Sequence, residues 1–273
     1  MSAVPTPAEP VIEVDGIVTR FGKQVVHDGV SFSIGRGELV ALIGGSGTGK
    51  SVLLREMIGL HPPSAGRVQL LGTDVWRSTV EELTAMRRRF GMMFQDGAMF
   101  SSLDVAANVA TPILEHARVP ADLLQPLVDL RLSLAGLTPD VGGKMPSELS
   151  GGMRKRAAIA RALALEPEVL FLDEPTSGLD PITARAFDHL LQFLCRDLGI
   201  TVLIVTHDLD TLLTIAERII VLGNGKVVAD GSIDEVTAVD DPWIKAYFSV
   251  RAMLGDAAVK TDGGQRAGGR HGA

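Results

Sequence analysis

The sequence predicts an α/β fold in which helices cover a mainly parallel β-sheet. Short apolar runs, bounded by glycine or polar residues, alternate with amphipathic helical stretches along most of the 273 residues. A composition of 46% hydrophobic and 22% charged residues suits one well-cored domain with at most a small insertion. The strand signal vanishes from about residue 96 to 149, so we expect a helical insertion there.

The pattern places each expected element in order. Strands are expected at residues 12–19, 30–34, 39–43, 90–94, 169–172 and 201–205, and a hairpin joins 218–222 to 226–229 through Gly223-Asn224-Gly225. Helices are expected at residues 52–59, 79–89, 104–117, 121–136, 151–165 and 180–199. Two pairs have the spacing of a capping box and mark helix starts, namely Ser78 with Glu81 and Ser232 with Glu235.

Composition and charge exclude several classes of protein. The net charge of −7 gives no general affinity for nucleic acid, and the single Cys195 excludes an internal disulfide framework. Residues 1–10 lack the basic start and apolar run of a secretory signal. No run of about 18 apolar residues predicts a membrane span, so any membrane role is expected from the water side. The polar, glycine-rich tail is expected to be disordered from about residue 255.

A glycine-rich loop between an expected strand and an expected helix matches the phosphate-binding pattern G-x-x-x-x-G-K-[ST] in full. Its residues are Gly44, Gly45, Ser46, Gly47, Thr48, Gly49, Lys50 and Ser51. The glycines allow backbone N–H groups to point at phosphates, at a helix N-terminus that favours anions. Lys50 is expected to reach the β- and γ-phosphates and to neutralise the γ-phosphate as it leaves, while the Ser51 hydroxyl ligates Mg²⁺.

The expected strand at 169–172 ends in two carboxylates, Asp173 and Glu174. Such charges at the end of a buried strand are costly unless they meet a cation or water. Asp173 is therefore a candidate Mg²⁺ ligand, and Glu174 is a candidate base that polarises an attacking water. The alternative is that Asp-Glu-Pro only forms the exit from the strand into a loop.

The segment Ser150-Gly151-Gly152 begins a basic helix, with Ser150 placed as its N-cap. By itself this pattern indicates either a second anion-binding helix start or an ordinary cap. Taken in order with the phosphate loop, Gln95, Asp173-Glu174, 177–180 and 206–208, it resembles the nucleotide-binding domains of ABC transporters over residues 11 to 240.

The resemblance implies a P-loop NTPase fold with a mainly parallel core sheet and an N-terminal antiparallel β region. The ABC domain would span residues 11–245, with a helical subdomain inserted at about 96–160, and residues 246–273 would form a C-terminal extension. ATP and Mg²⁺ are the implied cofactors.

The resemblance also implies roles for individual residues. Phe21 would stack on adenine, and Gln95 would touch Mg²⁺ and water and sense a transmembrane partner. His207 would contact the γ-phosphate, and Asp180 would couple two sites. The segment of Ser150, Gly151 and Gly152 would contact the γ-phosphate that is bound to a second copy of the chain. Two copies would then pair head to tail around ATP, since the chain has one phosphate loop and one such segment.

One departure helps to define the subfamily, because Met153 stands where the superfamily usually has glutamine. The segments 149–156, 93–103 and 108–110 together resemble the ATPase of MCE-associated, Mla-type lipid transporters. That resemblance implies phospholipid movement between the inner and outer membranes of a Gram-negative envelope, driven from the cytoplasmic face of the inner membrane. The implied partners are a permease, an MCE-domain protein and a STAS-domain protein.

Several alternatives stay open from the sequence. An ABC importer of a small solute would use the same chemistry, and a soluble ABC ATPase acting on nucleic acid or ribosomes is a third class. The segment 92–100 suits either a groove for a permease helix or core packing. Core packing is the alternative for residues 92–94, and the permease surface is favoured for Met99 and Phe100. Trp243, Tyr247 and Phe248 have helical spacing and either dock on the chain's own body or reach the other copy.

Overall fold

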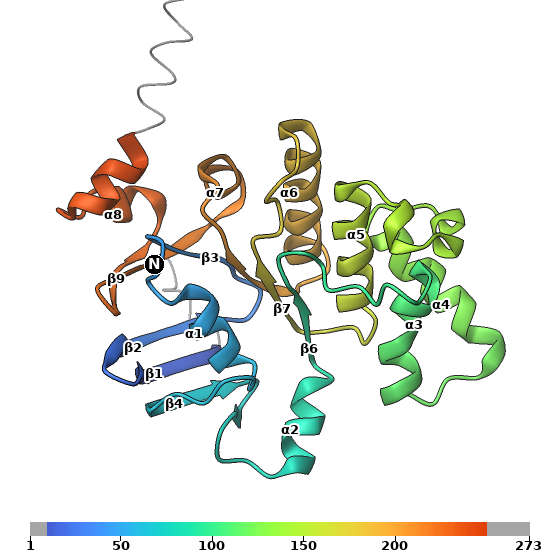
Figure 1. Ribbon diagram of the computed structural model, residues 1–273, viewed down its shortest axis with the longest axis horizontal. Coiled ribbons are helices and arrows are strands. Elements are labelled where there is room, and N and C mark those ends of the chain that lie inside the picture. The colour runs from blue at the N-terminus through green and yellow to red at the C-terminus, as the bar shows by residue number, and fades with distance from the viewer. Residues whose placement is uncertain (1–9, 250–273) are drawn as a thin grey trace, which may run out of the picture.

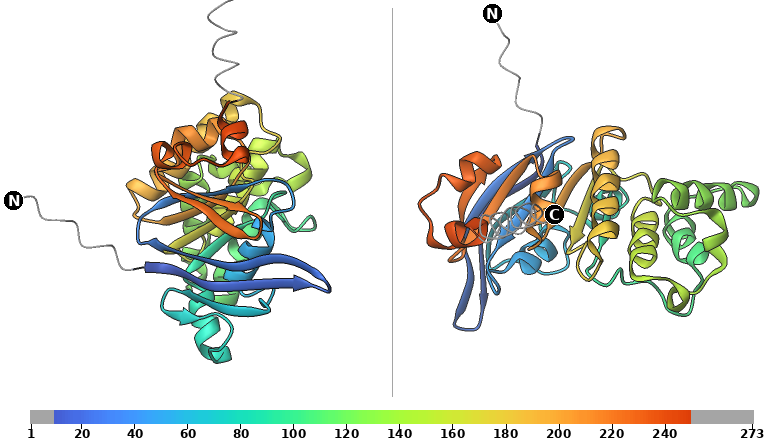
Figure 2. Two further views of the ribbon diagram at one scale, coloured as in Figure 1. Left: turned by 90° about the vertical axis from the view of Figure 1, so that its left-hand side faces the viewer. Right: turned by 90° about the horizontal axis from the view of Figure 1, so that it is seen from above.

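The structure, a computed structural model, describes residues 10–249. These residues form an elongated body with two sheets toward one end and a group of helices at the other (Figures 1 and 2). Two expectations concern residues outside the described part of the chain. One is the disordered tail from about residue 255, and the other is the absence of a secretory signal in the first nine residues.

The larger sheet has six strands in the order β10-β9-β3-β8-β7-β6. Their bounds are β3 Leu39–Gly44, β6 Phe90–Met93, β7 Val169–Asp173, β8 Thr201–Val205, β9 Arg218–Gly223 and β10 Lys226–Gly231. The strands from β9 to β6 run parallel, and β10 pairs antiparallel with β9. Helices and the second sheet cover both faces, so β3 and β8 are buried along their whole length, which explains their continuous apolar sequences.

The register of this sheet brings two predicted motifs to one edge. Val205 of β8 is the register partner of both Leu42 in β3 and Asp173 in β7. The phosphate loop follows β3 and the carboxylate pair ends β7. Both motifs therefore leave the sheet at the carboxyl ends of their strands, where ligands bind in open α/β sheets.

The smaller sheet is antiparallel and has the order β2-β1-β4-β5. Its strands are β1 Pro10–Phe21, β2 Gln24–Gly35, β4 Ala65–Leu70 and β5 Thr73–Asp74. Between the two sheets lies α1 (Lys50–Met57), whose buried Leu53, Leu54 and Met57 share one apolar cluster with Ile12 of β1 and Phe171 of β7. Burial of this helix between the sheets fixes the position of the phosphate loop at its N-terminus.

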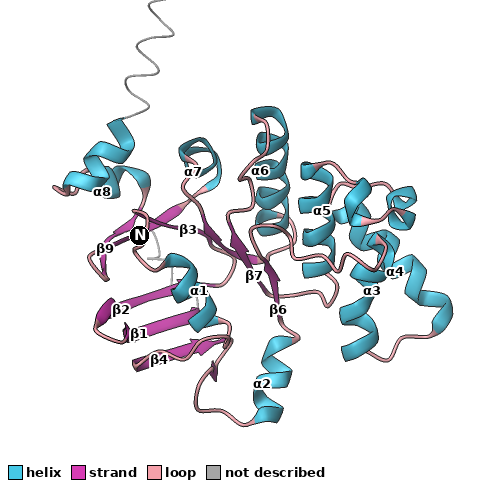
Figure 3. Ribbon diagram, viewed as in Figure 1, coloured by secondary structure: helices cyan, strands magenta, loops and turns pink. Residues whose placement is uncertain are grey.

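The helix α2 shares the apolar cluster of α1, and the other helices pack on the opposite face of the large sheet or beyond its edge (Figure 3). These helices are α2 Val80–Arg87, α3 Val105–His116, α4 Ala121–Leu134, α5 Gly151–Ala162, α6 Pro181–Arg196, α7 Leu209–Ile215 and α8 Ile233–Thr237, with short 3-10 helices at Pro139–Gly143 and Pro146–Glu148. Residues 242–249 are also helical. The stretch between β6 and β7 contains helices and no strand, as expected. None of the helices within residues 10–249 is long and apolar enough to cross a membrane.

The predicted fold class is confirmed, and the differences are local. The start of α2 was assigned to the wrong pair, because Thr79 with Glu82 forms the capping box there and not Ser78 with Glu81. The capping box of Ser232 with Glu235 is present at α8. The strands β4 and β5 and the helix α7 were not predicted.

Candidate functional site

The glycine-rich loop joins β3 to α1 and depends on glycine for its shape. Gly49 is the N-cap of α1 and has a left-handed φ of 91°. A Cβ atom on Gly49 would lie 2.4 Å from Nε2 of His27 and 2.5 Å from Cγ1 of Val26. A Cβ on Gly44 would lie 2.4 Å from the carbonyl oxygen of Leu222. At both positions a side chain is excluded by contact as well as by backbone conformation.

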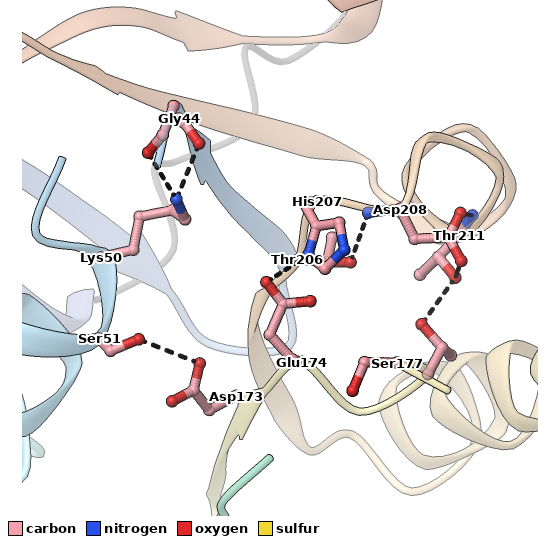
Figure 4. A network of polar contacts seen from close by, with 12 residues as sticks. Gly44, Lys50, Ser51, Asp173, Glu174, Ser177, Thr206, His207, Asp208 and Thr211 are labelled. Atoms are coloured by element: carbon pink, nitrogen blue, oxygen red, sulfur yellow. Dashed lines mark hydrogen bonds and ion pairs between the residues drawn. The ribbon is translucent and has the colours of Figure 1, made fainter. Parts of the chain in front are cut away.

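The Lys50 ammonium group folds over the loop. Its Nζ donates hydrogen bonds to the carbonyl oxygens of Gly44 at 2.8 Å and Gly45 at 3.0 Å (Figure 4). Burial lowers the pKa of Lys50, and the carboxylates of Glu174 and Asp173 oppose that shift. A cavity of about 260 Å³ opens beside the ammonium, lined by Val26, Gly47, Gly49, Lys50, Ser51 and Val52.

Ser51 and Asp173 meet across the sheet edge, where the Ser51 hydroxyl donates to Oδ1 of Asp173 at 3.4 Å. Burial and then the neighbouring Glu174 carboxylate raise the pKa of Asp173, while Ser51, Arg55 and Lys50 oppose the shift. Two hard oxygen atoms therefore stand next to a lysine at the mouth of the loop. The sequence predicted Ser51 and Asp173 as ligands of a magnesium ion and Lys50 as a ligand of the phosphates.

Glu174 follows Asp173 but points to a different partner. Its Oε1 lies 2.8 Å from Nδ1 of His207, which follows β8 (Figure 4). The Glu174 side chain is 14% exposed and that of His207 is 69% exposed, so the pair faces solvent from the histidine side. Glu174 has a φ of 50°, a left-handed conformation that is strained for a residue with a side chain. Strained residues of this kind cluster at functional sites.

Lys155 of α5 supports the strained turn and was not singled out from the sequence. Its buried Nζ donates to the carbonyl oxygen of Glu174 at 3.0 Å and to Oγ of Ser177 at 3.2 Å. Burial lowers the pKa of Lys155, and the carboxylates of Asp96 and Glu174 oppose the shift. The available signal was a charged residue in the apolar face of a helix that continues into Ala157 and Ala158.

A second network fixes the segment after His207. Asp208 caps α7, and its backbone N–H donates to Oγ1 of Thr206 at 3.0 Å. Within α7, the Thr211 hydroxyl donates to Oδ2 of the buried Asp188 at 3.2 Å. The loop that carries His207 is therefore tied to α6 as well as to β8.

The segment that starts α5 lies apart from the phosphate loop (Figures 1 and 2). Ser150 is the N-cap of α5, as predicted, and accepts a hydrogen bond from the backbone N–H of Met153 at 3.2 Å. A Cβ on Gly152 would lie 2.6 Å from Cγ2 of Thr183, whose hydroxyl donates to Asp180 at 2.5 Å. Within residues 10–249, no hydrogen bond or ion pair joins this group to the loop at residues 44–51.

Among the described residues, Gln95 and Phe21 make no hydrogen bond to the group around Lys50 and Glu174, and neither lines the cavity at Lys50. Gln95 is exposed two residues after the end of β6, and within the described residues its side chain makes no hydrogen bond. The following turn is held by Arg161, which donates to the carbonyl oxygens of Gly97 and Ala98 at 2.7 Å each. Phe21 is 46% exposed at the β1–β2 turn and stacks on His61 with ring centroids 5.1 Å apart. Phe21 does not line the cavity at Lys50.

The structure thus gathers Lys50, Ser51, Asp173, Glu174 and His207 at one edge of the sheet. A phosphate loop, an acidic strand end and an adjoining helical insertion define the protein as a nucleotide-binding cassette of the P-loop type. The family model described as "ABC transporter" matches residues 27–177, more than half of the chain. The chain belongs to the family of ABC transporter ATP-binding proteins, and it is an ATPase that binds ATP.

Curated relatives match most of this chain in sequence. The intermembrane phospholipid transport system ATP-binding protein MlaF of Escherichia coli K12 is 39% identical over 227 residues, which cover 83% of this chain and 84% of the relative. The MlaF protein of Haemophilus influenzae is 37% identical, with 85% and 87% covered. A probable ribonucleotide transport ATP-binding protein, mkl, of Mycobacterium tuberculosis is 35% identical, with 94% and 75% covered.

Solved structures share the fold. The dimeric bacterial ABC transporter cassette MJ0796 is 31% identical with a TM-score of 0.75, and the match covers 81% of this chain and 98% of that one. A dimeric post-hydrolysis state of the same cassette, bound to ADP and Pi, has a TM-score of 0.74 at 30% identity, with 81% and 98% covered. The cassette cbiO1 of Clostridium perfringens has a TM-score of 0.76 at 33% identity, with 84% and 91% covered.

Proposed function

We propose that this ATPase is the motor subunit of an ABC transporter that moves phospholipids between the inner and outer membranes. The observation that carries the cargo assignment is the match to two MlaF proteins at 37% and 39% identity over more than four fifths of each chain. The Met153 signature and the segments around Gln95 and Asn108 support the same subfamily.

The chemistry of hydrolysis rests on the residues at the sheet edge. Lys50 holds the β- and γ-phosphates and neutralises charge as the γ-phosphate leaves, together with the backbone N–H groups of the loop. Glu174 accepts a proton from the attacking water. His207 holds the Glu174 carboxylate through their 2.8 Å contact and reaches toward the γ-phosphate with its exposed ring.

The oxygen atoms of Ser51 and Asp173 fit a magnesium ion. They are hard donors 3.4 Å apart, and the described residues contain no cluster of three or more His, Cys, Asp or Glu side chains that would hold a metal alone. Magnesium typically takes one or two protein oxygens and completes its shell with phosphate oxygens and water. When bound, the ion would offset the negative charge of the β- and γ-phosphates. Gln95 would add an amide oxygen from the end of β6.

Two copies of the chain are needed for a complete site. The helix start of Ser150, Gly151 and Gly152 lies apart from the phosphate loop of the same chain, with Asp180 beside it. We propose that each copy places this segment on the γ-phosphate held by the loop of the other copy, while Phe21 covers the adenine. The similar cassette MJ0796 is dimeric, which supports the pairing of two copies.

The remaining partners are those that the proposed phospholipid transporter would need. A permease would dock on the helical insertion near Phe100, which is 51% exposed, whereas Met93 at the end of β6 is fully buried and belongs to the core. An MCE-domain protein and a STAS-domain protein would complete the transporter. The chain itself would act from the cytoplasmic face of the inner membrane as a peripheral subunit.

A second function is favoured by one observation. The mycobacterial mkl proteins, named as probable ribonucleotide transport ATP-binding proteins, match up to 94% of this chain. Import of a small solute such as a ribonucleotide would use the same ATPase site with a different permease.

Co-purification tests the proposal. A tagged copy, expressed in its own host, is captured from membranes solubilised in detergent, and the bound proteins and small molecules are identified by mass spectrometry. The proposal expects a permease, an MCE-domain protein and phospholipids retained above the level of a mock purification. Capture of a permease with a ribonucleotide-binding partner supports the importer, and capture of ribosomes or nucleic acid without membrane proteins contradicts both.

A further inference from the structure

The helical segment 242–249 lies against two loops of the ATPase site and has no assigned role. In Figure 1 it is the red coil above β9, at the end of the described chain. Tyr247 donates from its hydroxyl to the backbone carbonyl oxygen of His207 at 3.1 Å. The ring of Tyr247 stacks on Trp243, with centroids 4.9 Å apart and planes within 16°.

Trp243 reaches the other loop. A Cβ on Gly45 would lie 3.3 Å from Nε1 of Trp243, so the indole stands directly beside the first peptides of the phosphate loop. Gly45 is also the residue whose carbonyl oxygen accepts from Lys50 and from Thr48. One stacked aromatic pair therefore spans the distance from the phosphate loop to the loop of His207.

The segment is anchored well enough to act as a support. Asp241 caps it, since Oδ1 accepts hydrogen bonds from the backbone N–H groups of Trp243 at 2.8 Å and Ile244 at 3.0 Å. Ile244 is fully buried, and Trp243, Tyr247 and Phe248 pack on the same apolar cluster as the large sheet. The sequence left open whether Trp243, Tyr247 and Phe248 dock on the chain's own body or reach the other copy. In the described residues they dock on the chain's own body.

We infer that Tyr247 and Trp243 are positioning residues, which hold the His207 peptide and the phosphate loop in one fixed relation. The Tyr247 hydroxyl fixes the carbonyl of His207, and with it the direction in which the imidazole meets Glu174. Trp243 limits the movement of the Gly45 peptide. The inference rests on the proposed role of His207 in hydrolysis.

The environment of Tyr247 suits a permanent hydrogen-bond donor. Burial, followed by the nearby carboxylates of Asp208 and Glu174, raises the pKa of Tyr247 to about 12. The phenol therefore keeps its proton throughout the physiological range. Its hydrogen bond to His207, which in turn contacts Glu174, places the aromatic pair next to the reacting groups and not at a remote surface.

The first test removes a single hydroxyl. Tyr247→Phe should lower kcat for ATP by about threefold to tenfold, the effect of one hydrogen bond of ordinary strength, and should leave KM within about twofold. The exposed Lys245 on the same segment provides the control, because Lys245→Ala should change neither constant. An unchanged kcat in Tyr247→Phe, or an equal loss in Lys245→Ala, overturns the inference.

The second test does not depend on activity. The chain has six histidines, so the His207 signal in nitrogen-15 histidine NMR can be assigned as the one missing from His207→Ala. Tyr247→Phe should shift that signal, and Lys245→Ala should not. If the signal is unmoved in Tyr247→Phe, the hydroxyl does not position His207. If His207→Ala retains full ATPase activity, the proposed role of His207 fails instead, so the two failures can be told apart.

The part assigned to Trp243 can be tested by tryptophan fluorescence. The chain has two tryptophans, and Trp76→Phe leaves Trp243 as the remaining fluorophore. Adding a non-hydrolysable ATP analogue with Mg²⁺ should change Trp243 emission, because the indole touches the loop that closes on the phosphates. Trp243→Ala should raise KM several-fold while Trp243→Phe, which keeps the stack, should restore it. Unchanged emission together with a normal KM in Trp243→Ala overturns the part assigned to Trp243.

Discussion

Nδ1 of His207 lies 2.8 Å from Oε1 of Glu174, although the two residues belong to loops that follow different strands, β8 and β7. The contact exists because these strands are parallel neighbours and end at one sheet edge. It gives the candidate base a fixed direction while one side of the histidine stays open to solvent.

The first prediction concerns the carboxylate. Glu174→Gln keeps the size of the side chain but removes proton acceptance, so turnover of ATP should fall by about 100-fold or more while ATP binding is retained. Because the nucleotide then persists, a dimer should accumulate on addition of Mg-ATP, seen by size-exclusion chromatography with light scattering. Asp197→Asn at the exposed end of α6 serves as the control and should behave as the native protein. Normal ATPase activity in Glu174→Gln would refute the assignment of the base.

The second prediction concerns Lys155, which supports the strained turn at Glu174. Lys155→Met keeps most of the side-chain volume but leaves the Glu174 carbonyl without its charged donor, so kcat should fall about tenfold with a smaller change in KM. Arg154→Met provides a matched control, since Arg154 is exposed on the same helix and its side chain, among the described residues, hydrogen-bonds only to the Leu149 carbonyl at 3.5 Å. Equal activity of the two variants would show that Lys155 is not needed at the turn.

The third prediction concerns the contact between Gly49 and the buried pair behind the loop. His27 and Glu56 are both fully buried, and Nδ1 of His27 lies 3.3 Å from Oε2 of Glu56. Gly49→Ala forces a methyl group against His27 and Val26, so it should destabilise the fold by more than about 2 kcal/mol and abolish ATP binding. Gly199→Ala is the control, because Gly199 also has a positive φ of 69° but has open space around its Cβ.

Gly199→Ala should cost only about 1 kcal/mol, the backbone penalty, and should leave ATP binding intact. Urea unfolding and nucleotide titration of both variants measure the difference. Similar losses of stability in the two variants would mean that the contact with His27 adds nothing to the backbone cost.

The sequence predicted the large sheet well because its buried parallel strands are continuous apolar runs, as in β3 and β8. It missed β4 because Ala65, Gly66 and Arg67 are exposed and carry no apolar signal. It missed α7, whose seven residues are too few to show a helical period. The start of α2 was misassigned because Ser78 and Thr79 each have a glutamate three residues later, and only packing decides between two overlapping caps.

The residues of the candidate site also divide into those that the sequence predicted and those that it did not. The phosphate loop is local in sequence, so residues 44–51 were readable as one motif. Asp173 and Glu174 were predicted from the cost of charge at a buried strand end, without their partners. The contact of Lys155 with Glu174 joins a helix to a turn 19 residues away, and that of Tyr247 with His207 joins residues 40 apart. Such contacts depend on tertiary packing and leave no periodic signal in the sequence.

The last prediction concerns the pH dependence of stability through Asp188. Asp188 is 3% exposed, and its Oδ1 has no hydrogen-bond partner among residues 10–249. Burial raises its pKa from 3.8 to about 6; Asp208 adds to this shift, and Thr211, His189 and Arg185 oppose it. The folded state therefore holds this proton more tightly than the unfolded state, so the stabilisation is present below pH 3.8 and is lost as the pH rises through 6. Ionised Asp188 should cost about 3 kcal/mol above that range.

Asp188→Asn removes the titration, so the free energy of unfolding in urea should rise relative to the native protein at pH 8 and by less at pH 4.5. A difference between the two proteins that is the same at both pH values would show that Asp188 does not titrate in this range.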